Sequence, residues 1–472
     1  MALLKEVTPR ALQVGRLEPV IGPDRSAQLV AGAARLRERL GERTIWNVSS
    51  AAVGGGVAEM LQVLVGYAAG LGFPVRWLVI GGEPAFFGVT KRLHNQIHGE
   101  VGAEGLVDGS DALLYEQVLA ANADELIELV RPGDVALLHD PQTAGLTERL
   151  TGAGVRVIWR CHIGIDWQNE ATRAAWEFLR TYLATAFGFI FTRRQYAPAW
   201  ATPARTWVIP PSIDPFSAKN ADLDAQTTEA VLATVGLLRD PARELARFTR
   251  ADGSVGEVSR GGLVVGEDRP GPHDPIVTQV SRWDRLKDMA GVMRGFAACV
   301  PPDHAYLVLA GPDVAGVADD PEGAAVFSEC LEQWHQLPAQ ARARVLLVTL
   351  PLDDPEENAV MVNAIQRHAA VIVQKSLAEG FGLTVAEGMW KGRPVIGSAV
   401  GGIVDQIADG TGVLLPDPAD LGAFGTQVCR LLDQPEQSER MGWAGREYAR
   451  EHFLGDRHLL RLAEVVEAAI AD

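Results

Sequence analysis

The sequence predicts an α/β protein with two domains, each a doubly wound parallel β-sheet covered by helices. Three observations support this prediction. The chain has 472 residues, more than one hydrophobic core usually organises. Short apolar strands alternate with amphipathic helices, a pattern typical of parallel sheets. The alternation stops between about 211 and 274 and then begins again, so two domains are expected rather than one.

The first half supplies a regular series of elements. Apolar residues recur with helical spacing over 26–40, and a strand is expected at 44–50. Glycines then lead into a helix at 57–72, which is followed by a second strand at 75–82. Further strands with helices between them are expected at 134–140, 156–163 and 187–192. Together these elements define an expected N-terminal domain over residues 1–215.

The second half repeats the pattern after an irregular segment. Residues 216–273 contain a helical stretch and a charged, glycine-rich piece, typical of a connection that carries an inserted loop or hairpin. A second α/β domain is expected over 274–445. Its strands are expected at 274–283, 304–312, 345–351, 370–376 and 394–400. Residues 446–472 are expected to form a C-terminal helix that crosses back to the first domain.

Composition excludes several classes of function. The net charge of −17 argues against broad binding to nucleic acid or to an anionic membrane. The four cysteines are scattered without a CxxC pair, so neither a structural zinc site nor a disulfide framework is expected. There is no apolar run of about twenty residues to span a membrane, and the amino terminus lacks the apolar core of a signal peptide. A cytoplasmic location is therefore expected, with no metal site of the protein's own.

The first candidate site is the glycine run Gly54, Gly55 and Gly56, directly after a strand and before a helix. Glycines here let the backbone approach a phosphate, and a helix amino terminus favours negative charge. The run is not GxGxxG, and no acidic residue about twenty positions later is placed to bind a ribose. The sequence leaves open whether the run is an anion site or only a tight turn.

The second candidate site is the segment SRWDRLK, which ends the first strand of the second half. Ligands of open α/β sheets bind at the carboxyl ends of strands. Arg282 offers a planar fork and Lys287 a point charge, and both suit a diphosphate. Taken alone, the segment also fits a solvated loop.

The third candidate site is EGFGLTVAE, in which Glu379 and Glu387 flank a glycine-rich turn between a strand and a helix. Backbone amides near Gly382 and Leu383, just after Phe381, can meet phosphate oxygens, and Glu387 can accept hydrogen bonds from vicinal ribose hydroxyls. A helix-start acid stabilised by the helix dipole would explain one glutamate but not the pair.

These motifs together resemble the retaining GT-B glycosyltransferases of family GT4. The E-x7-E pattern with an upstream SR-x4-K carries this resemblance. The segments FFGVTK, HDPQ and WRCHI narrow it to the trehalose glycosyltransferring synthases and retaining trehalose phosphorylases. The similarity covers nearly the whole chain, in order, and implies a GT-B fold with two Rossmann-like domains facing a cleft.

The resemblance also implies roles for individual residues. Gly54 to Gly56 would close over the donor phosphate and sugar. Asp140 of HDPQ would bind acceptor hydroxyls, with Arg160 of WRCHI beside it, and His162 would contact the donor hexose. Arg282 and Lys287 would neutralise the diphosphate leaving group. Glu379 would bind donor sugar hydroxyls, Phe381 to Leu383 would line the donor site, and Glu387 would bind the ribose.

The implied reaction moves glucose from an NDP-glucose to glucose and gives α,α-trehalose reversibly, with retention at the donor carbon. The alternatives are a retaining trehalose phosphorylase, which would use inorganic phosphate, and a GT4 transferase for another sugar acceptor. The sequence leaves the base open among UDP-, ADP- and GDP-glucose. No tightly bound cofactor is expected, and any Mg²⁺ would arrive with the diphosphate. The family implies a homodimer.

Overall fold

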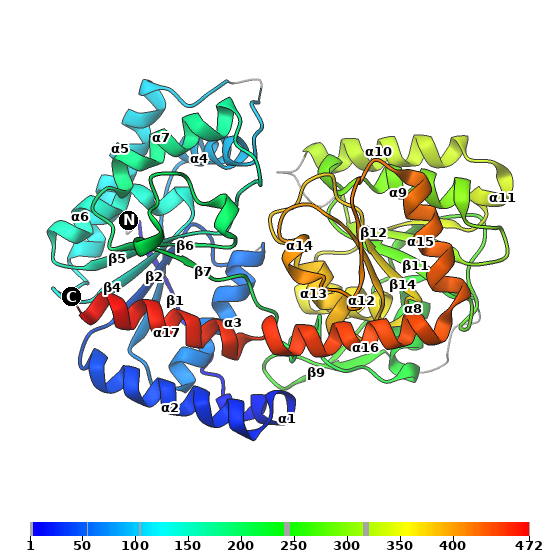
Figure 1. The fold of residues 1–472 in the computed structure, drawn as a ribbon, viewed down its shortest axis with the longest axis horizontal. Helices are drawn as coiled ribbons and strands as arrows, with labels where there is room; N and C mark the ends of the chain where they lie inside the picture. Colours follow the sequence, from blue (N-terminus) through cyan, green and yellow to red (C-terminus); the bar gives the residue numbers. More distant parts are fainter. Residues whose placement is uncertain (1–2, 54, 103–104, 240–245, 315–320, 472) are drawn as a thin grey trace. The chain divides into compact units, whose positions relative to one another are not determined.

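A computed structural model describes residues 3–53, 55–102, 105–239, 246–314 and 321–471. The chain divides into two compact units (Figure 1). Unit 1 comprises Met1–Ser212 and Phe453–Asp472, and unit 2 comprises Ile213–His452. Each unit contains one seven-stranded sheet, mostly parallel and flanked by helices, which confirms the predicted fold class.

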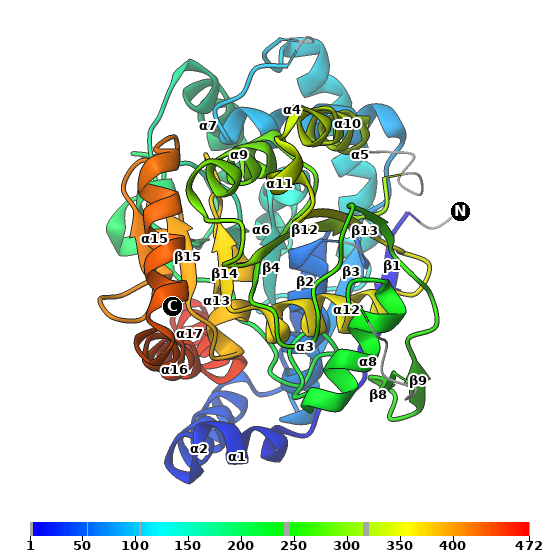
Figure 2. The ribbon, with the colours of Figure 1, turned by 90° about the vertical axis from the view of Figure 1, so that its right-hand side faces the viewer.

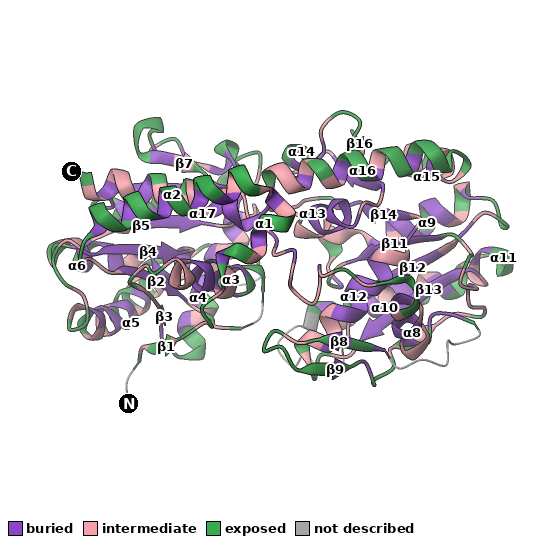
Figure 3. Ribbon diagram, turned by 90° about the horizontal axis from the view of Figure 1, so that it is seen from below, coloured by how far each residue is buried: buried purple, intermediate pink, exposed green. Residues whose placement is uncertain are grey.

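The sheet of unit 1 has the order β1-β3-β2-β4-β5-β6-β7. Strand β1 pairs antiparallel with β3, and the other neighbours pair in parallel. The strands are β1 (Lys5–Val7), β2 (Ile45–Ser49), β3 (Val75–Val79), β4 (Val135–His139), β5 (Arg156–Cys161), β6 (Gly188–Phe191) and β7 (Thr206–Val208). Strands β2 and β4 at the centre of the sheet are fully buried, as Figure 3 shows for β4.

Helices cover both faces of this sheet because strand side chains alternate between the faces. Trp46 and Val48 of β2 point into one core, whereas Ile45 points into the other. The first core is covered by α4 (Pro84–Ile97), α5 (Gly109–Ile127), α6 (Thr147–Gly152) and α7 (Glu170–Leu183). The second is covered by α2 (Pro23–Leu40), α3 (Gly56–Gly70) and α17 (Gly455–Ala471). The short helices η1 (Val14–Leu17) and α1 (Glu18–Ile21) precede α2 in the chain. Helix α17 lies along α2 (Figure 1).

The sheet of unit 2 has the order β10-β13-β12-β11-β14-β15-β16, with β10 antiparallel to β13. The strands are β10 (Leu263–Val265), β11 (Ile276–Val280), β12 (Tyr306–Pro312), β13 (Val345–Leu350), β14 (Val371–Gln374), β15 (Val395–Ser398) and β16 (Val413–Leu415). The helices of eight or more residues are α8 (Ala225–Val235), α9 (Met289–Cys299), α10 (Pro321–Gln336), α12 (Pro355–His368), α13 (Leu383–Trp390), α15 (Leu421–Asp433) and α16 (Pro435–His452). The shorter helices are α11 (Ala339–Arg342) and α14 (Ile403–Gln406).

The segment between the two alternating halves is built into unit 2. Helix α8 packs beside α12 (Figure 2). A small hairpin of β8 (Arg247–Thr249) and β9 (Val255–Glu257) follows, and β10 then adds an edge strand to the sheet. Residues 240–245, inside the expected insertion, lie outside the described residues.

The C-terminal helical stretch is interrupted at the boundary between the units. Helix α16 ends at His452, and α17 begins at Gly455. Phe453 and Leu454, between the two helices, are both buried. Among the described residues, none of the helices combines the length and apolar character needed to cross a membrane.

Candidate active site

In each unit the strand order creates a point where neighbouring loops diverge. In unit 1, β3 and β4 lie on opposite sides of β2, and in unit 2, β12 and β14 lie on opposite sides of β11. Ligands of doubly wound sheets bind at the carboxyl ends of the strands at such a switch point. The glycine run and Asp140 follow β2 and β4, while Arg282 and Glu379 follow β11 and β14. The topology therefore places candidate residues at the switch point of each sheet.

The glycine run of unit 1 leads directly into α3. Gly54 lies outside the described residues. Gly55 has φ 81° and precedes the first residue of α3, Gly56. This backbone conformation favours glycine because it lacks a Cβ. Gly55 and Gly56 are both exposed, so the first turn of a fifteen-residue helix is open to a ligand.

Asp140, at the end of β4, has an unusual backbone and a constrained carboxylate. Its φ is 63°, in the left-handed region that residues other than glycine seldom adopt. Its Oδ1 accepts a hydrogen bond of 2.7 Å from the backbone N–H of His162. The Trp159 indole donates to the carbonyl oxygen of Asp140 at 3.0 Å. Burial raises the pKa of Asp140 to about 7, so this carboxyl exchanges its proton near neutral pH.

His162 forms a hydrogen-bonded chain with His139 and Asn47. His162 Nε2 lies 3.0 Å from His139 Nδ1, and His139 Nε2 lies 3.2 Å from Asn47 Oδ1. Burial lowers the pKa of His139 to about 3 and holds the pKa of His162 well below its usual value, so both rings are neutral. Since the Asn47 oxygen only accepts, His139 carries its proton on Nε2 and accepts at Nδ1. His162 must then carry its proton on Nε2, which leaves its Nδ1 as an acceptor.

Arg160 points to the α17 side of the sheet. It is 1% exposed, and its Nη1 donates to His458 Nε2 at 2.6 Å. His458 therefore carries its proton on Nδ1, which lies 3.0 Å from Ser212 Oγ. Burial lowers the pKa of Arg160 to about 9. The described contacts of Arg160 tie β5 to α17, and its expected role in acceptor binding stays a prediction.

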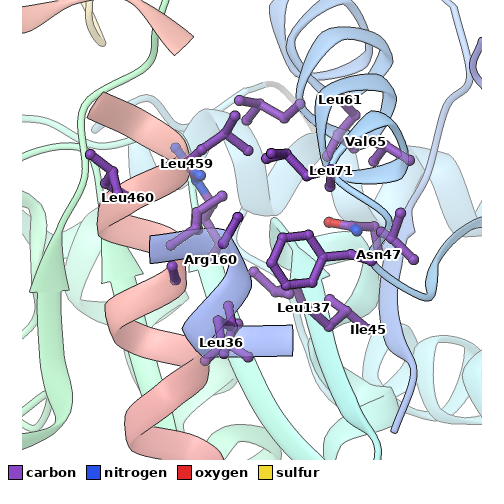
Figure 4. A pocket seen from close by; sticks show the side chains of 18 of the residues that line it. Leu36, Ile45, Asn47, Leu61, Val65, Leu71, Leu137, Arg160, Leu459 and Leu460 are labelled. Carbon is purple, nitrogen blue, oxygen red and sulfur yellow. The ribbon is translucent and has the colours of Figure 1, made fainter. Parts of the chain in front are cut away.

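An apolar cavity of about 80 Å³ lies on the same face of unit 1 (Figure 4). Its wall is mostly aliphatic and includes Leu36 of α2, Leu61 of α3 and Leu460 of α17. The polar members of the wall are Asn47, His139 and Arg160. A sugar needs many hydrogen-bonding partners, so this cavity does not suit the acceptor.

In unit 2 the structure brings Lys287 and Glu379 together. Lys287 Nζ lies 2.7 Å from Glu379 Oε2, and both side chains are mostly buried. Gln374 Nε2 and Ser376 Oγ donate to the same oxygen at 3.4 and 3.2 Å. Both residues were expected to act at the donor site, but their ion pair was not predicted.

Arg282 differs from Lys287 in its freedom to move. Its side chain is 64% exposed and pairs with Asp284 at 3.1 Å. Asp284 also accepts from the backbone N–H of Leu286 at 2.8 Å, which fixes the turn at η5 (Arg285–Lys287). The Arg282 guanidinium can therefore reorient toward an anion without breaking a buried contact.

Helix α13 begins at the EGFGL turn. Gly382 precedes it with φ 83°, and a Cβ there would come within 3.1 Å of Glu379 Cγ. Gln406 Nε2 donates to the carbonyl oxygens of Phe381 and Gly382, so the turn is held from α14. Glu387, one turn into the helix, is 5% exposed. The turn thus fixes the helix amides and both carboxylates relative to one another within unit 2.

Several residues with functional contacts were not identified from the sequence. Asn47, His139 and His458 support Arg160 and His162, while Gln374 and Ser376 support Glu379. His139 directly precedes Asp140 in the HDPQ segment, so its position beside a candidate residue could have identified it. His458 lies 298 residues from Arg160, and no local pattern marks it.

No group of three or more metal-ligating side chains stands together in the part of the chain that the structure describes, and Mg²⁺ bound with the diphosphate stays a prediction.

Two family models match the chain. Residues 47–198 match "Trehalose synthase, N-terminal domain", and residues 273–448 match "Glycosyl transferases group 1". The trehalose synthase of Pyrococcus horikoshii is 34% identical over 471 residues, 98% of each chain. That of Rubrobacter xylanophilus is 32% identical over 469 residues, 97% of each. A trehalose phosphorylase of Pleurotus pulmonarius is 26% identical over 434 residues, which are 86% of this chain and 54% of that protein.

Solved structures share the fold. The α,α-trehalose-phosphate synthase (UDP-forming) of Burkholderia vietnamiensis matches with a TM-score of 0.62 at 15% identity, over 91% of this chain and 99% of that one. Anabaena Alr3699/HepE in complex with UDP-glucose matches with a TM-score of 0.56 at 13% identity, over 90% and 99%. The likeness to these structures identifies the two sheets as a GT-B fold. Relatives above 30% identity that align over nearly their whole length decide the family: the chain belongs to the trehalose synthase family of glycosyltransferases.

Proposed function

We propose that the protein transfers glucose from a nucleoside diphosphate glucose to free glucose and forms α,α-trehalose reversibly, with retention at the donor carbon. The observation that carries this proposal is the arrangement at the start of α13. There Lys287 is paired with Glu379, the first helix amides follow Gly382, and Glu387 lies buried one turn later. A cation with amides suits a diphosphate, and carboxylates suit sugar and ribose hydroxyls.

In the proposed reaction the bond between the glucose C1 and the diphosphate oxygen breaks. A new bond forms between C1 and the anomeric hydroxyl oxygen of the acceptor, on the same face of the sugar. The hydroxyl proton passes to the departing diphosphate, which acts as the base. Arg282, Lys287 and the amides of Gly382 and Leu383 stabilise the charge that develops on the leaving group.

The residues of unit 1 would hold the sugars. Asp140 would accept hydrogen bonds from acceptor hydroxyls. His162 would contact the donor hexose, and Nδ1, its acceptor nitrogen, suits a sugar hydroxyl. Lys287 has three N–H donors, so it can keep its contact with Glu379 while another N–H meets a phosphate oxygen. The described part of the glycine run offers amides at the start of α3.

A second candidate is trehalose phosphorolysis, in which inorganic phosphate replaces the nucleoside diphosphate. The similarity of this chain to a trehalose phosphorylase supports phosphorolysis as a second candidate. The two can be separated by incubating the protein with trehalose and either a nucleoside diphosphate or inorganic phosphate. Formation of NDP-glucose supports the proposed function, whereas glucose 1-phosphate alone would replace it with phosphorolysis. Another acceptor sugar, the homodimer and the cytoplasmic location stay predictions.

A further inference from the structure

The segment 213–222, after β7, has no role in the site described so far. The structure fixes its second half against two helices of unit 2. Asn363 Nδ2 of α12 donates to the carbonyl oxygens of Ala218 and Ala221 at 3.0 and 2.8 Å. Trp390 Nε1 of α13 donates to the carbonyl oxygen of Asn220 at 3.2 Å. The backbone on both sides of Lys219 is therefore held in place.

This anchoring brings Lys219 to Glu387. Its Nζ lies 3.8 Å from Glu387 Oε1, and the two side chains are 25% and 7% exposed. The next residue, Asn220, accepts a 3.0 Å hydrogen bond through Oδ1 from the buried Lys391 Nζ. Lys391 Nζ also lies 3.4 Å from the carbonyl oxygen of Glu387. The segment is thus attached to the same helical turn as the carboxylate that it faces.

A nearby positive charge stabilises a mostly buried carboxylate and holds it in one orientation. Lys391 is deeply buried, and burial lowers its pKa to about 7, so its charge is a weak source of support. Lys219 keeps partial contact with solvent and can supply that charge. At 3.8 Å the pair is loose enough for Glu387 to receive hydroxyl groups as well.

We propose that Lys219 is the positioning residue for Glu387, which it holds ready for the ribose hydroxyls of the donor, so that the segment 213–222 sets a preference for ribonucleotide donors. This inference rests on the proposed function. It assigns Lys219 an effect on donor binding and no part in bond breaking. Loss of the lysine charge should therefore weaken donor affinity and leave the chemical step intact.

The test uses Lys219→Met, which removes the charge but keeps much of the apolar stem. With the best ribonucleotide sugar donor, KM should rise about fivefold, as expected for loss of a partly buried ion pair, with kcat unchanged. Lys219→Arg should restore most of the affinity because it restores the charge. With the 2′-deoxyribose form of the same donor, the effect of Lys219→Met should shrink, since Glu387 then has one hydroxyl fewer to bind.

Asp222→Asn is the matched control. Asp222 lies on the same segment and pairs with Arg367 at 2.9 Å, but its side chain is 76% exposed and faces a different partner. Its donor KM should stay at the wild-type value. An unchanged KM in Lys219→Met, or an equal rise with both forms of the donor, would overturn the inference while the proposed function stands. A wild-type protein that transfers from no nucleotide sugar would overturn both.

Discussion

Arg282 and Lys287 are two cations on one loop with different constraints. Lys287 is fixed on Glu379, whereas Arg282 is exposed and pairs with Asp284. If Arg282 meets the diphosphate only as charge develops on it, Arg282→Ala should lower kcat by about two to three orders of magnitude, as for loss of a single oxyanion donor. Steady-state kinetics with a nucleotide sugar and glucose measure this loss.

The neighbouring Arg285 provides the control. It is exposed and pairs with Glu329 on α10 at 2.6 Å. Arg285→Ala removes the same charge three residues away and should leave kcat near the wild-type value. Equal losses in the two variants would mean that only the net charge of the loop matters. Near-normal turnover in Arg282→Ala would refute its assignment.

Asp140 should make stability depend on pH. Because burial raises its pKa to about 7, the folded protein keeps this proton between about pH 4 and pH 7 while the unfolded chain loses it. The folded state binds more protons in that window, so raising the pH lowers the contribution of Asp140 to stability. Asp140→Asn does not titrate. The free energy of unfolding of this variant, relative to wild type, should therefore increase from about pH 4 to pH 7 and level off above.

Urea unfolding of the wild type and of Asp140→Asn across that pH range measures the difference between their free energies of unfolding. The contributions of the other titrating groups cancel in this difference. A difference that is constant with pH, or that moves in favour of the wild type as the pH rises, would show that the Asp140 pKa is not raised.

The sequence located the strand-end residues better than it located their partners. Asp140 and His162 lie at the carboxyl ends of predicted strands, and the end of a strand can be recognised from the local sequence. Alternation along β2 and β4 could also have placed Asn47 and His139 on one face, since each lies two residues after a core residue of that face. The hydrogen bond from Arg160 to His458 depends on where α17 packs, which no local pattern specifies.

At the scale of elements, the start of α13 depends on Gly382. Alanine there must adopt φ 83° and brings its Cβ to 3.1 Å from Glu379 Cγ. Gly382→Ala should lower the free energy of unfolding by roughly 1 kcal/mol or more and should also weaken donor binding. Gly236, the residue after α8, has φ 88°, and a Cβ added there would lie 3.7 Å from Val264. Gly236→Ala should cause a similar loss of stability without loss of donor affinity, which thermal unfolding and donor titration can separate.

A buried ion pair and an exposed ion pair join helices α2 and α17. Arg25 and Asp456 form hydrogen bonds of 2.7 to 3.0 Å with side chains 11% and 0% exposed. Asp456→Ala leaves a mostly buried guanidinium without this partner and should destabilise unit 1 by about 3 kcal/mol. The exposed pair Arg39–Glu467 joins the same helices at 3.4 Å, and Glu467→Ala should change stability by less than about 1 kcal/mol. Urea unfolding measures both losses. Equal losses of unfolding free energy in the two variants would contradict the claim that the buried ion pair contributes more than the exposed one.

The sequence predicted long elements better than short ones. Strand β11 lies within the expected strand at 274–283, and α2 contains the predicted helix at 26–40. Strands β1 and β10 were not predicted, since each has three residues and both pair at a sheet edge. Three residues are too few for alternation to be visible, and the pairing of β10 with β13 is a tertiary effect.

At the scale of the whole molecule, each sheet contributes its own switch point and its own set of candidate residues. Unit 1 presents neutral histidines and a carboxyl that titrates near neutral pH, as expected for binding uncharged hydroxyls. Unit 2 presents cations, carboxylates and helix amides, as expected for a nucleoside diphosphate. The family resemblance implied this division of chemistry, whereas the ion pair between Lys287 and Glu379 depends on how unit 2 folds.

The most direct test is NMR analysis of the product after the pure protein is mixed with glucose and, separately, with UDP-, ADP- and GDP-glucose. A disaccharide with both anomeric carbons in an α,α-1,1 linkage is expected from at least one donor, and the donor that gives it fastest identifies the base. If no donor gives this product, while trehalose and phosphate release glucose 1-phosphate, nucleotide-dependent transfer is contradicted.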